Sequence, residues 1–413
     1  MRDMISKLPE GWSAVPLSQI AHEVQERNPN EPDIPVLSVT KYDGFVLSLE
    51  YFKKQIFSKD TSNYKLVRKG QFAYATIHLD EGSIDLLDKF DCGLISPMYT
   101  VFEPDSKKVD LNYLRYQMKS GRFIQMYAHL GQGSINRRKS ISFNTLGTIT
   151  IPLPPITEQQ KITAILSSVD EAIASTQAVI DQTRKVKQGL LQQLLTRGIG
   201  HTKFKHSAIG KIPESWQVVE LGDITTDSAF GPRFSGELYD PNGNYGSVRT
   251  TDINENWEIN YETVPRAMLP EAQCENHRLM DGDLLVTRSG SCGIVCVFRE
   301  QTIPMIPGAF LIRFRLKNYA NSEFVRLAMM TPTAQSSMAT MAAGGVQKNL
   351  SGTNLKKLLL PLPLLDEQDK IVSRYKDVLQ SEKSSQANLQ QLEQLKRGLM
   401  QDLLTGRIRV KTS

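Results

Sequence analysis

The chain has 413 residues, and its 49 Lys and Arg against 44 Asp and Glu give a formal net charge of +5. A single core rarely exceeds about 300 residues, so two or three structural units are expected. The slight positive charge permits contact with nucleic acid without requiring it. No apolar run reaches the roughly 18 residues of a membrane helix, and the four cysteines have no regular spacing, so we expect a soluble cytoplasmic protein.

The first segment in chain order, residues 1–155, alternates short β-branched or aromatic runs with turn residues. We predict strands in IPVLSVTKYDGFV, GQFAYATI and LISPMYTVFEP, and a helix in LNYLRYQMKSGRFIQMYAH. This mixture of elements predicts an α+β domain.

A long helix is predicted next, over residues 156–200. The prolines of IPLPPITEQQKI prevent an earlier start, and Thr157 is expected to cap the helix. Apolar residues then recur at alternating spacings of four and three, which is the heptad pattern of a coiled coil. The expected seam residues are Ile162, Leu166, Val169, Ile173, Ile180, Leu190 and Leu194.

The same plan then recurs. Residues 201–363 contain YGSVRTTDI, GDLLVTRSGSCGIVCVF and IPGAFLIRFRL as predicted strands, followed by the predicted helix SEFVRLAMMTPTAQSSMATM. Residues 364–408 form the second long helix, with Asp366 as its expected cap. Its seam residues are Ile371, Tyr375, Val378, Leu389, Leu392, Leu399 and Leu403, and polar Lys187, Lys396 and Glu382 at seam positions are expected to set the register.

Direct comparison of the two halves shows an internal repeat. Residues 151–199 and 360–408 are identical at 20 of 49 positions, where chance gives about three. Residues 8–20 likewise resemble 212–224, whereas the interiors share only the order of their elements. We therefore expect two similar α+β domains and two long helices that form an antiparallel intramolecular coiled coil with pseudo-twofold symmetry. The alternative is two separate helices, each packed on its own domain.

Both interiors end in a glycine-rich loop with polar or basic residues, GQGSINRRKSIS and GGVQKNLSGTN. Arginine can pair with guanine, and asparagine or glutamine with adenine, while all three also reach phosphates. The candidate DNA-binding residues in these loops and in three other glycine- or serine-rich stretches are Arg137, Arg138, Lys139, Arg233, Arg249, Arg288, Gln347, Lys348 and Asn349. The alternative is that these loops are solvated and only cap helices.

The sequence contains no recognisable catalytic group. It has neither a dinucleotide-binding glycine motif nor a phosphate-binding loop. Cys292 and Cys296 have no second pair, and Cys274 with His277 lacks further zinc ligands, so packing is favoured over metal binding. We expect no catalytic residue, no metal site and no bound cofactor.

This order of segments resembles the specificity subunit of type I restriction-modification systems. The resemblance rests on the repeated junctions IPLPPITEQQKI and LPLPLLDEQDKI, each followed by a long helix that ends in GLLQQLLT or GLMQDLLTGRI. It implies that residues 1–155 and 201–363 are target recognition domains for the two halves of an asymmetric bipartite DNA site. Residues 156–200 and 364–408 are then conserved spacer helices.

The resemblance also implies partners. Two methyltransferase subunits that carry S-adenosylmethionine and methylate adenine are expected, with two motor-nuclease subunits that use ATP and Mg in the larger complex. Candidate docking residues, expected to be exposed, are Glu158, Gln159, Glu367 and Gln368. Two other readings remain: a methyltransferase or nuclease, for which the motifs are missing, and a coiled-coil adaptor with two protein-binding domains.

Overall fold

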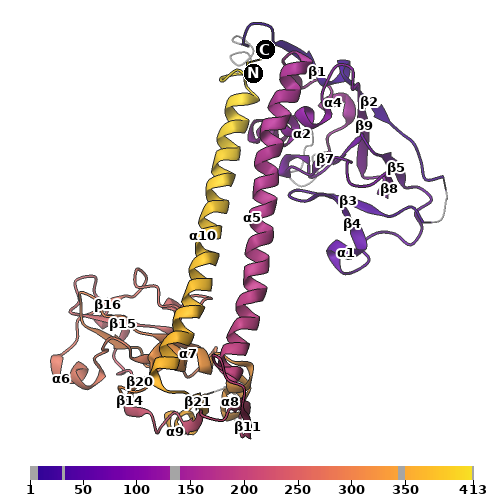
Figure 1. Cartoon of the computed structure of the whole chain (residues 1–413). Coiled ribbons are helices and arrows are strands. Elements are labelled where there is room, and N and C mark those ends of the chain that lie inside the picture. The colour runs from indigo at the N-terminus through magenta and orange to yellow at the C-terminus, as the bar shows by residue number, and fades with distance from the viewer. Residues whose placement is uncertain (1–7, 30–32, 131–139, 343–348, 412–413) are drawn as a thin grey trace. The chain divides into compact units, whose positions relative to one another are not determined.

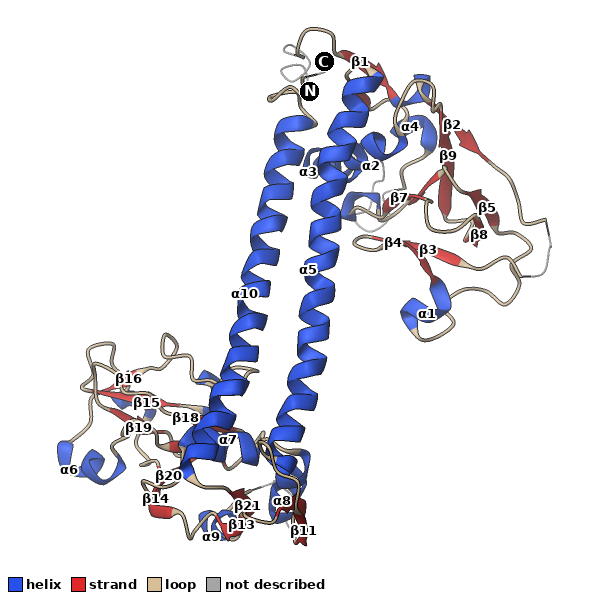
Figure 2. Cartoon of the chain, viewed as in Figure 1, coloured by secondary structure: helices blue, strands red, loops and turns tan. Residues whose placement is uncertain are grey.

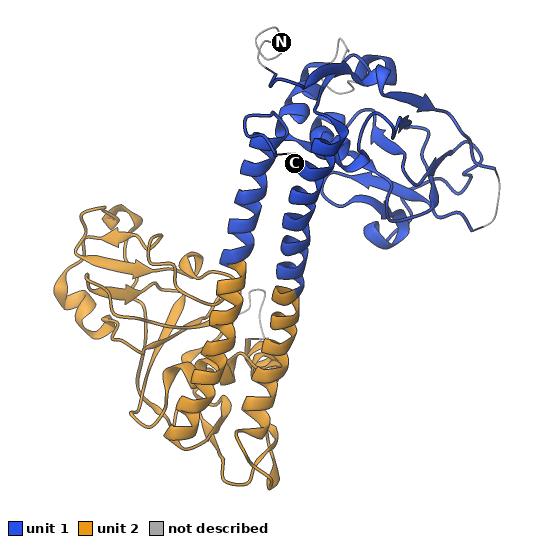
Figure 3. Cartoon of the chain, turned by 45° about the horizontal axis from the view of Figure 1, so that its top comes forward, with its two compact units in different colours: residues 1–178, 387–413 blue, residues 179–386 orange. Residues whose placement is uncertain are grey.

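The computed structural model describes residues 8–29, 33–130, 140–342 and 349–411. By internal contacts the chain divides into two compact units, residues 1–178 with 387–413 (unit 1) and residues 179–386 (unit 2). Figure 3 shows that each unit takes part of both long helices. The helices therefore belong to the cores of the units rather than forming a separate domain between them.

Within its described residues, unit 1 begins with ten strands and four short helices. Its strands are β1 Ser13–Pro16, β2 Ala21–Val24, β3 Leu37–Thr40, β4 Gly44–Leu47, β5 Lys65–Arg68, β6 Phe72–Ala75, β7 Ile84–Leu86, β8 Cys92–Ile95, β9 Tyr99–Pro104 and β10 Thr150–Leu153. Its short helices are α1 Ser48–Phe52, α2 Leu111–Lys119, α3 Gly121–Leu130 and α4 Phe143–Leu146, and the long helix α5 Ile156–Arg197 follows β10. A four-stranded antiparallel sheet in the order β2-β9-β6-β7 is its largest sheet.

Unit 2 repeats this plan. Its strands are β11 Phe204–Ser207, β12 Gly210–Pro213, β13 Gln217–Glu220, β14 Thr225–Phe230, β15 Tyr245–Val248, β16 Arg266–Ala267, β17 Leu284–Thr287, β18 Val295–Val297, β19 Met305–Pro307, β20 Leu311–Leu316 and β21 Leu359–Leu362. Its helices are α6 Glu271–Cys274, α7 Ser322–Met329, α8 Pro332–Ala342, α9 Gly352–Lys356 and the long α10 Leu365–Leu403. The main sheet has the order β14-β20-β17-β18, and Figure 2 shows β15, β16 and β19 together in a second sheet.

The constant stretches of sequence pair with each other in each unit. In unit 1, β1 pairs antiparallel with β10, and Ser13 lies opposite Leu153. In unit 2, β13 pairs with β21, and Gln217 lies opposite Leu362, in the same register. Figure 1 shows β1 beside the start of α5. The repeated sequence thus forms a two-stranded ladder that closes each domain and leads into a long helix.

The long helices supply part of each hydrophobic core. In unit 1, Ile162 and Leu166 of α5 cluster with Leu403, the last residue of α10, and with Leu404 after it. In unit 2, Leu194 near the end of α5 clusters with residues near the start of α10, among them Ile371 and Tyr375. Within each unit the helices therefore run antiparallel. The predicted α+β repeat with an intramolecular helix pair is confirmed.

Two details differ from the sequence predictions. Thr157 and Asp366 lie inside the first turns of α5 and α10, because the helices begin one residue earlier, at Ile156 and Leu365. The carbonyl of Pro155 accepts hydrogen bonds from the Glu158 and Gln159 backbone amides, so the chain before the helix closes the first turn. The predicted domain helices are also divided, residues 111–129 into α2 and α3, and residues 322–341 into α7 and α8.

Candidate nucleic-acid interface

In unit 2 a recess lies where two parallel strands end. Strands β15 and β19 are paired in parallel, so their carboxyl ends meet at the same edge of the sheet. The residues that follow them, together with the loop after β14, line a recess of about 570 Å³. Its lining includes Arg233, Phe234, Tyr239, Ser247, Arg249 and Phe310. Loops at the carboxyl ends of parallel strands are common places for ligand contacts.

Arg249 is held rigidly at this recess. Its Nε lies 3.2 Å from Asp252 Oδ2, and its Nη2 lies 2.8 Å from Asp252 Oδ1 and 3.1 Å from the Thr263 carbonyl oxygen. The hydrogen bond to Asp252 raises the pKa of Arg249, against the lowering effect of burial. The Arg249 guanidinium is therefore held in one orientation at this edge by its ion pair with the buried Asp252 carboxylate.

Exposed aromatic rings surround the same recess. Phe310 is 60% exposed and Tyr239 is 40% exposed. The ring of Tyr239 packs edge-on against Phe234, with centroids 5.3 Å apart. Aromatic rings beside arginines suit stacking contact with nucleobases.

Arg288 forms a second cationic position next to the recess. It follows β17, and its guanidinium carbon lies 4.4 Å from the ring centroid of Phe230, which is 42% exposed. Its Nε donates to Asn349 Oδ1 at 3.3 Å. The Arg288 backbone amide donates to the carbonyl of Phe310 at 3.0 Å, which links this position to the recess.

The structure brings part of the predicted DNA-binding set together and leaves part of it untested. Arg233, Arg249, Arg288 and Asn349 all lie in or beside this edge of unit 2. The other candidates, Arg137, Arg138, Lys139, Gln347 and Lys348, lie outside the described residues. Sequence reasoning missed the aromatic residues Phe230, Tyr239 and Phe310. An aromatic residue next to Gly and Pro in AFGPRF and PGAF was the available signal.

The expected docking residue Glu158 is buried, which corrects the prediction that it is exposed. It is 1% exposed, and its carboxylate accepts hydrogen bonds from Trp12 Nε1 at 3.3 Å and Arg409 Nε at 2.8 Å. Burial tends to raise the pKa of Glu158, but the hydrogen bonds and charge of Arg409 outweigh this effect and lower it. Glu158 therefore ties the end of the chain to its beginning within unit 1.

Glu367 has the corresponding role in unit 2. Its carboxylate accepts hydrogen bonds from Trp216 Nε1 at 3.0 Å, the Ile199 amide at 3.0 Å and His201 Nε2 at 2.8 Å. Trp12 and Trp216 occupy matching positions in the repeated sequence. The acid is retained in both copies because it joins a tryptophan of the frame to the segment that follows a long helix.

The two glutamines next to these acids are also buried. Gln159 is 1% exposed and Gln368 is 0% exposed. Gln159 accepts from the Asp110 amide at 2.8 Å and donates to the Pro154 carbonyl at 2.9 Å. Gln368 accepts from the Asn321 amide at 2.8 Å and donates to the Pro363 carbonyl at 2.8 Å. All four expected docking side chains are thus engaged in hydrogen bonds within the chain, and Glu367 alone remains partly exposed.

The predicted seam faces inward in both helices. Each of its fourteen apolar residues, seven on α5 and seven on α10, is buried or partly buried. Polar seam residues form ion pairs between the helices. Lys187 and Arg184 of α5 bind Glu382 of α10 at 2.5 and 3.0 Å in unit 2, and Lys396 binds Asp170 at 2.5 Å in unit 1.

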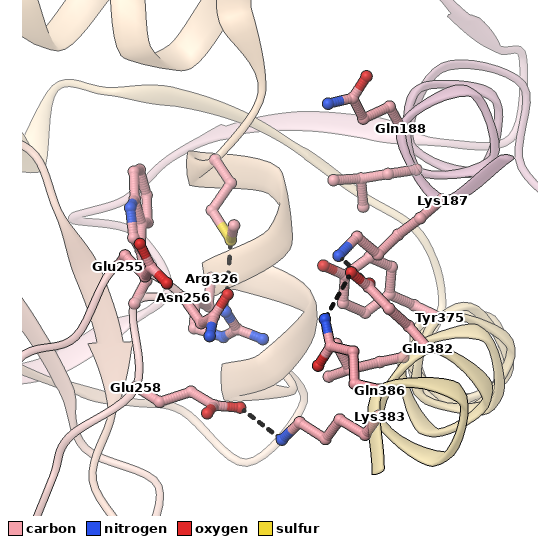
Figure 4. A pocket seen from close by; sticks show the side chains of 14 residues that line it. Lys187, Gln188, Glu255, Asn256, Glu258, Arg326, Tyr375, Glu382, Lys383 and Gln386 are labelled. Carbon is pink, nitrogen blue, oxygen red and sulfur yellow. Dashed lines mark hydrogen bonds and ion pairs between the residues drawn. The ribbon is translucent and has the colours of Figure 1, made fainter. Parts of the chain in front are cut away.

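A second cavity of unit 2, of about 240 Å³, lies beside the Glu382 cluster (Figure 4). It is lined by α5, α7, α10 and the loop 255–258, and Lys383 of α10 binds Glu258 of this loop at 3.2 Å. Acidic and basic side chains around it are largely paired with each other in Figure 4. We assign it to the attachment of the loop to the helices and not to ligand binding.

The described residues contain no group of three or more His, Cys, Asp or Glu side chains placed to hold a metal ion. Among the same residues, no helix combines the length and the apolar character needed to cross a bilayer.

Comparison with known proteins identifies the family. The family model described as "Type I restriction modification DNA specificity domain" matches residues 9–183 and again 213–394. The chain is 28% identical to the Methanocaldococcus jannaschii type I restriction enzyme MjaVIII specificity subunit, over 98% of this chain and 95% of the relative. It is 25% identical to the Escherichia coli EcoKI specificity subunit, over 89% and 82% of the two chains.

Solved structures agree on the fold. A chain from a study of type I R-M complex assembly matches with a TM-score of 0.62 at 18% identity, covering 97% of this chain and 100% of the other. The HsdS subunit from Thermoanaerobacter tengcongensis matches with a TM-score of 0.54 at 18% identity, covering 99% and 100%. The chain therefore belongs to the type I restriction-modification DNA specificity family and is a DNA sequence-recognition subunit.

Proposed function

We propose that each unit of this subunit reads one half of an asymmetric, bipartite DNA site. The observation that carries the proposal is the repeat itself, in which the same ladder register frames two interiors of different sequence. Two domains of one fold with different surfaces suit two half-sites of different sequence, as half-site spacing follows dimer geometry in other DNA-binding proteins. The surface of unit 2 that reads DNA consists of the recess after β15 and β19 and the neighbouring position of Arg288.

The long helices set the distance between the half-sites. A helix rises about 1.5 Å per residue, so the 42 residues of α5 span roughly 60 Å. The ion pairs of Glu382 and Asp170 fix how far α10 slides along α5 inside each unit. The number of unspecified bases between the half-sites follows from this length.

Catalysis belongs to partner subunits. The frame occurs twice, which suits two copies of one partner, and relatives are named as specificity subunits of type I restriction enzymes. We infer two methyltransferase subunits that bind S-adenosylmethionine, joined in the restricting complex by two motor-nuclease subunits that use ATP and Mg. They dock on outer surfaces of the helical frame and not on Glu158 and Glu367, whose carboxylates are engaged within the chain, and the assembly works in the cytoplasm.

The experiment is to co-express this chain with its methyltransferase subunit in a host without adenine methylation and to map modified adenines by single-molecule sequencing. A motif of two unlike half-sites separated by unspecified bases is expected. Exchange of residues 225–359 for those of a relative should alter one half-site only, because β13 and all but the first residue of β21 remain as the frame. A stable complex that methylates no motif would instead favour the protein-binding adaptor.

A further inference from the structure

We propose that Arg288 reads a guanine in the half-site of unit 2, and that Phe230 and Asn349 hold its guanidinium for this contact. The proposal rests on the proposed function, in which unit 2 reads DNA. It adds the identity of one base and assigns one residue to it.

The guanidinium of Arg288 is fixed at one end and open at the other. Phe230 packs against its face at 4.4 Å, and Asn349 Oδ1 accepts from Nε at 3.3 Å. Neither Nη1 nor Nη2 makes a hydrogen bond or an ion pair to another described residue. The two Nη atoms at the end of the fork therefore remain for a ligand, while the stem has lost much of its rotamer freedom.

Guanine is the base that fits this fork. In the major groove it presents two acceptors, O6 and N7, at the spacing of two Nη donors. Adenine presents N7 beside an N6 amino donor, which would oppose one Nη. A restrained arginine loses less conformational freedom on binding, and a bidentate contact discriminates against other bases by about 5- to 150-fold.

Asn349 is a positioning residue in this arrangement. The sequence alone suggested that it contacts a base itself, as asparagine does with adenine. In the structure its Oδ1, which would accept from adenine N6, already accepts from Arg288 Nε. Its strand bridge to Ser289 and the hydrogen bond from the Leu350 amide to the Arg288 carbonyl at 2.8 Å hold the two segments together.

Arg249 cannot make the same contact. Its Nη2 donates to both Asp252 and Thr263, so both of its Nη2 hydrogens are in use, and its Nε is bound to Asp252. Only Nη1 remains for a ligand. Arg249 is therefore not the guanine contact.

The first half of the chain lacks this arginine. The Ile141 amide donates to the Thr76 carbonyl at 2.9 Å, as Leu350 does to Arg288, and the Thr76 amide donates to the Met98 carbonyl, as Arg288 does to Phe310. Thr76 and Met98 each precede their counterparts by 212 residues (288 − 76 and 310 − 98), and Ile141 precedes Leu350 by 209 (350 − 141). Thr76 thus occupies the place of Arg288, and the guanine contact belongs to one half-site only.

The first test uses the methyltransferase complex and the motif map. Wild type should show a guanine–cytosine pair at one position of the half-site that exchange of 225–359 alters. Arg288→Ala and Arg288→Lys should both relax that position to more than one base, since lysine keeps the charge but loses the fork. The other half-site should not change, and Arg266→Ala, an exposed arginine in β16 of the same unit, should keep the whole motif.

The second test measures binding of the purified complex to a duplex with 7-deazaguanine at that position, which lacks the N7 acceptor. Wild type should bind this duplex about tenfold more weakly than the guanine duplex, a difference of about 1.4 kcal/mol. Arg288→Ala should bind the two duplexes equally. Asn349→Ala and Phe230→Leu should give intermediate losses, and they decide the matter if Arg288→Ala fails to assemble.

The outcomes separate the two proposals. No motif from wild type overturns the proposed function and this inference with it. A bipartite motif whose altered half contains no guanine–cytosine pair, an unchanged motif in Arg288→Ala, or an equal loss with 7-deazaguanine in wild type and variant overturns only the assignment of Arg288.

Discussion

Single residues at the two junctions show how a repeated motif can mislead. Glu158, Gln159, Glu367 and Gln368 recur because each copy needs the same internal hydrogen bonds. Charged and amide side chains in a first helical turn are exposed in an isolated helix, which is why the sequence suggested a docking surface. The strands and loops that cover them come from distant parts of the chain, and the local pattern contains no information about that cover.

Gln159 is predicted to be essential for stability, and its neighbour Gln160 is not. Gln159→Ala leaves the Asp110 amide and the Pro154 carbonyl without their partner in a buried site. The expected loss is about 1–3 kcal/mol of unfolding free energy, measured by urea denaturation. Gln160→Ala, an exposed position on the same turn, should change stability by no more than about 0.5 kcal/mol. Equal effects of the two substitutions would contradict the assigned role.

The site residues were partly predictable at this scale. Arg249 and Arg288 could be selected because arginines among Gly and Ser suit close contact with DNA. The sequence could not predict that the two arginines have different roles, because these depend on their partners Asp252, Thr263 and Asn349. Asp252 lies three residues from Arg249 and was visible in the sequence, whereas Asn349 reaches Arg288 across 61 residues.

At the scale of elements, the heptad pattern located the long helices and their inward faces. The spacing of apolar residues depends only on helical geometry, so one sequence was sufficient. The polar seam residues were also visible. Their partners could be predicted only in part. Lys187 binds Glu382, whereas Lys396, at the equivalent position of the repeat, binds Asp170. Each seam is longer than one domain can cover because each helix is long enough to take part in both units.

Glu382 is predicted to stabilise unit 2 while it is ionised. Burial tends to raise its pKa, but the hydrogen bonds and charges of Lys187 and Arg184 lower it overall. Glu382→Gln leaves a partly buried lysine without its partner. We expect a loss of about 1–3 kcal/mol at pH 7, less than for a fully buried pair because Arg184 is half exposed.

The pH dependence of this loss follows from the lowered pKa. The Glu382 contribution is complete above the unfolded value of about 4.3 and disappears as the pH falls through the lower folded value. The difference between wild type and Glu382→Gln in urea denaturation should therefore be constant from pH 7 to about 5 and shrink below about 4. Glu393→Gln, an exposed position on α10, serves as the control. A difference that grew on acidification would refute this account.

At the scale of the whole molecule, the repeat determines that recognition is modular. Each unit closes its own domain with a strand ladder and its own helix-end core. Substitutions within one interior should therefore leave the other unit's fold and half-site intact. The two long helices are shared by both units, so changes in their length act on both.

Lengthening both helices by the same amount is predicted to change the gap between the half-sites. Insertion of four residues near the middle of α5 and at the matching position of α10 adds about one turn, or about 5.4 Å. At about 3.4 Å per base pair, the unspecified gap should grow by one or two base pairs while the bases read stay the same. Methylation mapping of this variant gives the answer, and an unchanged gap would mean that the helices do not set it. Insertion into α5 alone should disrupt the paired seam and abolish methylation.

The sequence by itself determined the repeat, the two α+β domains, the helix pair and the family, because periodicity and self-similarity are properties of the chain read along its length. Tertiary structure decided which polar side chains remain available for contact with DNA or a partner. Burial of Glu158 and Gln159, the stacking of Arg288 on Phe230 and the exposure of Phe310 all depend on segments far apart in the chain. A side chain's availability to DNA or to a partner is set by what packs around it, and only the folded chain defines that surrounding.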